Sequence, residues 1–133
     1  MARQSVLIVD DKAIWHRLLG RLLCELGYDV YAAASCAEGL RLAGLRAPDC
    51  IILDFHLTDG DAVLVCAALK SNKKTALIPV VVFSSDPAAE ITAYAECGAA
   101  YFVLKGPDSM TVLPAVIASV LAPSTKRNLI VEA

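Results

Sequence analysis

Short runs of β-branched and other apolar residues alternate with longer segments of helical period along this chain of 133 residues, and no other feature limits its fold more strongly. The runs expected as strands are residues 5–9, 29–33, 50–53, 78–83 and 99–104. The segments that follow them repeat their apolar residues at helical spacing. Such alternation is typical of a parallel sheet that helices cover on both faces. The sequence therefore predicts an α/β protein with a doubly wound, five-stranded parallel sheet.

Several residues mark the expected ends of the helices. Gly27 is expected to stop the first helix, and Ser35 and Glu38 have the spacing of a capping box at the start of the second. Pro114 lies inside the last apolar segment, where a proline in a helix costs about 3 kcal/mol. We therefore expect the last helix either to begin near Thr111 or to kink.

Charge and composition exclude several functional classes. The chain has 14 acidic and 12 basic residues, and its net charge of -2 offers no electrostatic attraction to nucleic acid or to an anionic membrane. No segment supplies the roughly 18 consecutive apolar residues of a transmembrane helix. The first residues run into a strand without a signal-peptide apolar region, so we expect a cytoplasmic protein. One domain over residues 1–123 and a short tail over residues 124–133 are expected.

The five cysteines show no metal-binding or redox spacing. Free cysteines in a reducing compartment are most often small buried residues. All five are therefore expected in the core.

Polar residues stand where four of the five expected strands end. Asp10 and Asp11 follow the first strand, Asp54 follows the third, and Ser84 and Lys105 follow the fourth and fifth. In an open parallel sheet, ligands bind beyond the carboxyl ends of the strands, where the strand order reverses. With the strand order 2-1-3-4-5, that point lies between the first and third strands. All five side chains are therefore expected in one cleft.

The residue types in this predicted cleft suit phosphoryl transfer. Three carboxylates repel one another unless they share a cation, and hard oxygen ligands suit Mg²⁺. A carboxylate can also attack phosphorus and form an acyl phosphate, while Mg²⁺ and a lysine neutralise charge on the transferring oxygens. Residues 9–12 contain no glycine-rich phosphate loop, and this disfavours a nucleotide-binding fold.

These motifs resemble the receiver domain of bacterial two-component response regulators, and the resemblance covers residues 4 to about 122. The family's acidic pair matches Asp10 and Asp11, its phosphoacceptor matches Asp54, its switch hydroxyl matches Ser84, and its invariant lysine matches Lys105. The resemblance implies the flavodoxin-like (βα)5 receiver fold and a single-domain protein similar to the chemotaxis regulators. It also implies that Asp10, Asp11 and Asp54 bind Mg²⁺ and that Lys105 and Ser84 stabilise the phosphoryl group.

Two further positions take roles from the resemblance. Phe102 occupies the position of the family's switch aromatic residue, and the backbone carbonyl of His56 is expected among the metal ligands. The chain departs from the family pattern at Thr58 and Ala62, which replace a proline and a glycine, and at Gly106, where a proline usually stands. These departures concern the loops around the expected site.

The resemblance implies a signalling function and no enzyme activity beyond the domain's own phosphorylation and dephosphorylation. A histidine kinase or phosphotransfer protein would donate the phosphoryl group to Asp54. Phosphorylation would then alter binding to a downstream protein, or to a second copy, through the fourth helix, the fifth strand and the last helix. Two alternatives stay open. One is a degenerate receiver that docks without phosphorylation, and the less favoured one is a haloacid-dehalogenase-type phosphatase, whose Asp-x-Asp motif is missing at residues 10–12.

The last helix adds a separate observation. Residues 109–125 contain no charged side chain, although a helix on the outside of a sheet normally presents a charged face to water. This absence predicts either an exposed apolar patch or a neutral outer face formed by Ala115, Ala118, Ser119 and Ala122.

Overall fold

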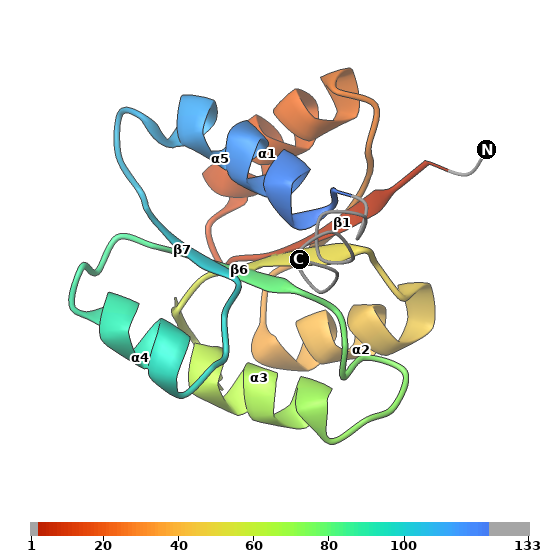
Figure 1. Ribbon diagram of the computed structural model, residues 1–133, viewed down its shortest axis with the longest axis vertical. Helices are drawn as coiled ribbons and strands as arrows, with labels where there is room; N and C mark the ends of the chain where they lie inside the picture. The colour runs from red at the N-terminus through yellow and green to blue at the C-terminus, as the bar shows by residue number, and fades with distance from the viewer. Residues whose placement is uncertain (1–2, 123–133) are drawn as a thin grey trace, which may run out of the picture.

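A five-stranded parallel sheet forms the middle layer of the structure, a computed structural model that describes residues 3–122 (Figure 1). Its strands are β1 (Ser5–Val9), β2 (Asp29–Ala33), β3 (Cys50–Leu53), β6 (Val80–Ser84) and β7 (Tyr101–Leu104), in the order β2-β1-β3-β6-β7. All neighbouring strands in this sheet are parallel, so the predicted order 2-1-3-4-5 is confirmed. Two short strands that the sequence did not predict, β4 (His56–Leu57) and β5 (Gly60–Asp61), form a separate antiparallel hairpin.

Helices cover both faces of the sheet. The helices on one face, above the sheet in Figure 1, are α1 (Ala13–Glu25) and α5 (Ser109–Val120). The helices on the other face are α2 (Cys36–Arg46), α3 (Ala62–Lys70) and α4 (Ala89–Ala95). The predicted doubly wound α/β architecture is therefore confirmed.

Alternating side chains along the strands build a core on each face of the sheet. In β1, Val6 and Ile8 pack on the side of α1 and α5, whereas Leu7 and Val9 pack on the side of α2, α3 and α4. All four residues of β3 are buried, as a central strand covered on both faces requires. Each fully buried aliphatic side chain stabilises the fold by roughly 1.5–3 kcal/mol relative to an exposed one. The two cores thus fix the strand ends from which the polar residues project.

The start of α2 is capped from two directions. The Ser35 hydroxyl accepts a hydrogen bond from the Glu38 amide at 3.1 Å, as the capping-box spacing predicts. In addition, the carboxylate of Asp59, in the loop after β3, accepts from the amides of Cys36 at 2.8 Å and Ala37 at 3.1 Å. These bonds tie the loop after β3 to the neighbouring helix.

Backbone geometry marks the ends of two helices. Gly27 follows α1 with φ 96° and Gly98 follows α4 with φ 63°, in the left-handed region that favours glycine. The last helix begins at Ser109, two residues before the expected start, and Pro114 lies inside it. The Ser109 hydroxyl accepts a hydrogen bond from the Gly106 amide at 2.7 Å, and this bond fixes the loop before the helix.

The outer face of α5 is mostly neutral. Its exposed residues include Ala115, Ala118 and Ser119, and Ala122, just after the helix, is also exposed. Leu113 and Ile117 are buried against the sheet, and Val112 is the large apolar residue of this helix that stays exposed. The neutral-face alternative therefore describes most of this helix.

Three expectations about the whole chain have different outcomes. The cysteines at positions 36, 50, 66 and 97 are buried as expected, but Cys24 is exposed on the outer side of α1, so the expectation was wrong for this residue. Among residues 3–122, no helix is long and apolar enough to cross a membrane. The expected tail, residues 124–133, lies outside the described residues.

Candidate functional site

Hydrogen bonds that continue the pairing of the strands hold the polar residues at the strand ends. The amides donate as follows: Asp10 to the carbonyl of Ala33 at 3.0 Å, Asp54 to Val9 at 2.9 Å, and Lys105 to Ser84 at 2.8 Å. The backbone at each of these three positions is therefore fixed by the sheet. Because the strands are parallel, their carboxyl ends meet at one edge of the sheet, and the side chains project from there.

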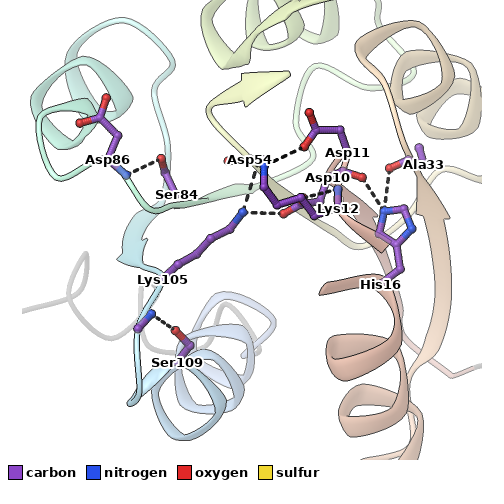
Figure 2. A network of polar contacts seen from close by, with 11 residues as sticks. Asp10, Asp11, Lys12, His16, Ala33, Asp54, Ser84, Asp86, Lys105 and Ser109 are labelled. Carbon is purple, nitrogen blue, oxygen red and sulfur yellow. Dashed lines mark hydrogen bonds and ion pairs between the residues drawn. The ribbon is translucent and has the colours of Figure 1, made fainter. Parts of the chain in front are cut away.

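Lys105 lies between two carboxylates in a buried position (Figure 2). Its Nζ is 2.8 Å from Asp10 Oδ2 and 3.3 Å from Asp54 Oδ2, and only 7% of its side chain is exposed. The ammonium also lies 5.4 Å from the ring centroids of Trp15 and Phe83, where an aromatic face attracts a cation. These contacts hold the lysine charge against the carboxylates.

Asp10, Asp11 and Asp54 form a cluster of three carboxylates. One ligand oxygen from each residue lies within 4.8 Å of the others. Such oxygen donors suit Mg²⁺, which binds through carboxylates and keeps several waters. An open cavity of about 330 Å³ adjoins Lys105 and is lined by Lys12, Trp15, Ser85, Lys105 and Gly106. The donor set thus fits a hard divalent cation, and the cavity leaves open space beside Lys105.

The carboxyl group of Asp54 has a raised pKa. Burial has the largest effect and raises the pKa, the positive charge of Lys105 acts against it, and the negative charge of Asp10 raises the pKa again. An ionised Asp54 is therefore less favourable in the folded protein than in the unfolded chain.

Asp54→Asn is expected to stabilise the protein at neutral pH in the presence of a chelator. Because the folded state binds more protons than the unfolded state between the two pKa values, the stability of the parent protein falls as the pH rises through that window. The advantage of the variant should shrink below the ordinary carboxyl pKa of about 4, where Asp54 is protonated in both states. Thermal unfolding of both proteins across this pH range measures the difference. An asparagine variant that is less stable than the parent at neutral pH would contradict the expected cost of the charge.

His16 lies directly behind the acidic pair, although it does not follow a strand. Its Nε2 is 2.6 Å from the carbonyl oxygen of Asp10 and 3.1 Å from that of Ala33 (Figure 2). Both partners only accept, so Nε2 carries the proton and donates to both. The ring therefore ties α1 to the ends of β1 and β2. No spacing along the sequence reveals this contact, because it depends on how α1 packs beside two strands.

Ser84 and the loop after it connect to the other side of the site. The Ser84 hydroxyl is buried and accepts a hydrogen bond from the Asp86 amide at 3.1 Å. The Asp86 carboxylate accepts from His56 Nε2 at 2.9 Å and from the Ala88 amide at 3.0 Å. The His56 bond, followed by the Ala88 bond, lowers the pKa of Asp86. The loops after β3 and β6 are thus joined through side chains.

Phe102 lies in β7, at the edge of the sheet. Its ring is half-buried and packs against the core beneath α4, and its amide donates to the hydroxyl of Tyr94 in α4 at 2.9 Å. Phe102 is therefore linked to α4 through both its ring and its backbone. Among residues 3–122, Phe102 makes no hydrogen bond to the carboxylates of the cluster.

The loop after Asp54 has a defined shape despite its unusual residues. Thr58 lies between β4 and β5 of the hairpin, and Ala62 is fully buried at the start of α3. The Ala62 amide donates to the carbonyl of Phe55 at 2.8 Å. A small buried residue at this position allows the close return of the chain toward β3.

A doubly wound sheet with three carboxylates and a buried lysine at its strand ends defines the class of small receiver modules in signalling. The chain matches the family described as "Response regulator receiver domain" over residues 6–117. It belongs to this family of two-component signalling domains, and the resemblance found in the sequence is confirmed.

Individual relatives agree with the family match. The chain is 33% identical over 123 residues to the "Probable transcriptional regulator ycf27" of Porphyridium aerugineum. This match covers 91% of this chain and 49% of that protein. It is also 31% identical over 114 residues to the acid tolerance regulatory protein ActR of Rhizobium meliloti (strain 1021). This match covers 86% of this chain and 58% of ActR. The chain thus spans about half the length of these relatives.

A solved structure shows the same fold at similar sequence identity. The signal receiver domain of a signal transduction histidine kinase from Syntrophus aciditrophicus is 30% identical to this chain. It superimposes with a TM-score of 0.79, and the match covers 90% of each chain. Receiver domains similar to this chain are thus described both in regulators and in a histidine kinase.

Proposed function

We propose that this chain is a phosphoacceptor receiver that takes a phosphoryl group on Asp54 from a histidine kinase or phosphotransfer protein in a Mg²⁺-dependent reaction. The observation that carries the proposal is the cluster of Asp10, Asp11 and Asp54 with the buried ammonium of Lys105 between two of them. The family match supports it. Within this proposal, the domain extends over residues 1–123.

In the proposed step, a carboxylate oxygen of Asp54 attacks the phosphorus of the donor phosphohistidine. A new P–O bond forms, the P–N bond breaks, and the departing imidazole nitrogen takes up a proton, which leaves an acyl phosphate on Asp54. Lys105, already 3.3 Å from Asp54, would then pair with an oxygen of the phosphoryl group. The proposed domain catalyses only its own phosphorylation and dephosphorylation.

The proposed Mg²⁺ ligands are the carboxylates of Asp10, Asp11 and Asp54 and the backbone carbonyl of His56. When bound, the ion supplies positive charge that offsets the charge on the transferring oxygens. The hydrogen bond from the Lys12 amide to Asp10 Oδ1 at 2.9 Å, together with the contact of His16 to the Asp10 carbonyl, would orient the acidic pair toward it.

Lys12→Ala is expected to tighten Mg²⁺ binding by about threefold, as is typical of an exposed charge interaction worth under 1 kcal/mol. Lys12 Nζ lies 3.4 Å from Asp11 Oδ1, and 63% of its side chain is exposed. Its charge therefore competes with a cation at the acidic pair. Titration of Trp15 fluorescence with Mg²⁺ at low salt measures the affinity, and the gain should shrink as salt screens the charges. Lys74→Ala, an exposed lysine before β6, should leave the affinity unchanged, and equal affinities for Lys12→Ala and the parent would contradict the prediction.

Incubation with acetyl phosphate and Mg²⁺, followed by intact mass measurement, tests the proposed function. The protein should gain the mass of one phosphoryl group, and chelation of the divalent ion should prevent the gain. A protein that gains no phosphoryl group under conditions that modify a known receiver would contradict the proposal and favour the docking-module alternative. No observation favours the phosphatase alternative.

Ser84 and Phe102 are the proposed switch residues. The Ser84 hydroxyl now accepts from the Asp86 amide, and it would instead donate to a phosphoryl oxygen on Asp54. This exchange would draw the loop after β6 toward the site, and Phe102 would turn toward the space vacated. In this proposal, the added charge on Asp54 would thus shift the equilibrium between two arrangements of the surface around the loop after β6 and Phe102.

The proposed output surface comprises α4, β7 and α5. Its exposed large side chains are Ile91, Tyr94, Tyr101, Leu104 and Val112. The hydroxyls of Tyr101 and Ser119 lie 3.4 Å apart and connect β7 to α5. An apolar surface next to the switch aromatic residue suits a downstream protein or a second copy of the chain.

Ile91→Glu is expected to weaken such binding by about tenfold or more, because a charge would have to be buried in an apolar contact. Ile91 is 79% exposed on α4, so the variant should fold normally. Analytical ultracentrifugation of the phosphorylated protein measures self-association. Leu45→Glu, at a 62% exposed position on α2, provides the control. A parent protein that stays monomeric with and without phosphorylation would exclude the homodimer and leave a downstream protein as the proposed partner.

A further inference from the structure

A second cavity lies at the amino ends of β6 and β7, away from the carboxylates. Its volume is about 280 Å³, and its lining includes two cysteines, Cys66 and Cys97, together with Lys70 and Leu77. Lys70 and Leu77 are exposed, Leu77 to 95%, so the cavity opens to solvent beside them. The proposed receiver chemistry uses none of these residues.

The two cysteines come from different elements and meet at this cavity. Cys66 lies in α3 and Cys97 follows α4, and they are only 2% and 1% exposed. Both line the same cavity, and each affects the pKa of the other: Cys97 raises that of Cys66, and Cys66 lowers that of Cys97. The remaining cysteines among the described residues do not line this cavity. The fold has thus brought two thiols, distant in sequence, into the lining of one cavity.

Backbone hydrogen bonds fix the position of Cys97. Its amide donates to the carbonyl of Thr92 at 3.2 Å, and its carbonyl accepts from Lys70 Nζ at 2.9 Å. Lys70 belongs to the same helix as Cys66. The lysine therefore already ties the end of α3 to the chain after α4, beside the cavity that both thiols line.

We propose that Cys66 and Cys97 are an oxidisable thiol pair that closes to an intramolecular disulfide and joins α3 to the connection between α4 and β7. The two thiols that line this cavity are the partners, and the cavity gives a small oxidant such as hydrogen peroxide a route to them. The inference is independent of phosphorylation at Asp54.

The reaction balances with one hydrogen peroxide for each disulfide. The Cys97 thiolate attacks one peroxide oxygen, the O–O bond breaks, and a sulfenic acid forms as the first water leaves with the thiol proton. The Cys66 sulfur then attacks the sulfenic sulfur, the S–S bond forms, and the second water leaves with the Cys66 proton. The two thiols lose two electrons, and the peroxide gains them. A dithiol reductant reverses the change.

The surroundings of the two thiols determine which of them reacts first with peroxide. Burial raises the pKa of Cys66 to about 12, and the neighbouring Cys97 adds to the effect. Burial also raises the pKa of Cys97; Cys66 acts against this increase, the charge of Asp61 adds to it, and the charge of Lys70 acts against it. Cys97 therefore forms the thiolate more readily. Because a protonated thiol is a poor nucleophile, oxidation should require sustained exposure to peroxide.

The test uses the full chain with Cys24→Ser, which removes the exposed thiol that would form intermolecular disulfides. The protein is exposed to hydrogen peroxide in mildly alkaline buffer, denatured, alkylated and analysed by mass spectrometry. Two fewer cysteines should be alkylated than before oxidation, and the mass before alkylation should fall by two hydrogens, about 2 Da. A peptide map without reductant should contain one cross-linked species with Cys66 and Cys97, which dithiothreitol removes.

Variants and a local probe complete the test. Cys66→Ser and Cys97→Ser should form no disulfide: each should retain all its remaining thiols or gain an oxygen on a remaining thiol. Circular dichroism checks that both variants fold. If one variant fails to fold, the peptide map of the Cys24→Ser protein still shows whether Cys66 and Cys97 form the disulfide. Amide exchange at residues 93–99 should slow upon oxidation. A disulfide that includes Cys36 or Cys50, or thiols of Cys66 and Cys97 that stay fully alkylated when added peroxide has oxidised Cys24 in the parent, would overturn the proposal.

Discussion

Asp54→Asn is expected to abolish phosphoryl incorporation when the protein is incubated with acetyl phosphate and Mg²⁺. Asparagine retains the shape of the side chain, but its amide cannot form the acyl phosphate that a carboxylate oxygen forms. The other two carboxylates of the cluster should not take over, because Asp10 is paired with Lys105 at 2.8 Å and Asp11 follows the end of its strand by two residues. Intact mass measurement should therefore show no phosphorylated species of the variant.

The control for this experiment is Asp59→Asn. Asp59 lies in the same loop region as Asp54, but its carboxylate accepts from two amides at the start of α2 and lies outside the carboxylate cluster. This variant should be phosphorylated like the parent. An Asp54→Asn protein that is modified as fully as the parent would show that the acceptor is another residue, and peptide mapping would then locate it.

The sheet could be predicted from the sequence because its central strands are marked strongly. Residues 50–53 are apolar on both faces and end at Asp54, and the structure starts and ends β3 at the predicted residues. The ends of other strands carried weaker signals. The fourth strand begins at Val80, two residues after the predicted start, because the residues before it belong to a turn in which the Ile78 amide bonds to the Thr75 carbonyl.

The candidate site separates into predictable and unpredictable parts for a physical reason. Residues at strand ends converge because the parallel topology brings strand ends together, so Asp10, Asp54 and Lys105 could be placed near one another from the sequence. The contact of His16 with two carbonyls and the contact of His56 with Asp86 depend on the packing of a helix and on the path of two loops. Neither packing nor loop path follows from periodicity along the chain.

Lys105→Met is expected to lower the free energy of unfolding by roughly 3 kcal/mol in the absence of divalent ions, the order of magnitude for breaking a buried ion pair. Methionine keeps much of the apolar stem of lysine but removes the charge. The carboxylates of Asp10 and Asp54, whose side chains are 2% and 7% exposed, would then face each other without the ammonium. Urea unfolding in the presence of a chelator measures the loss.

The cause of this loss can be distinguished from a simple packing defect, because the lost charge can be replaced. Mg²⁺ should restore part of the stability of Lys105→Met, since a cation at the carboxylate cluster offsets the same repulsion, and acidic pH should restore part of it by protonating the carboxyl groups. Lys70→Met is the matched control, because Lys70 donates to a carbonyl and has no carboxylate partner among residues 3–122. Its stability should respond little to Mg²⁺. A Lys105→Met protein whose loss of stability is the same with and without Mg²⁺ would show that the lysine acts through packing and that its charge does not balance the carboxylates.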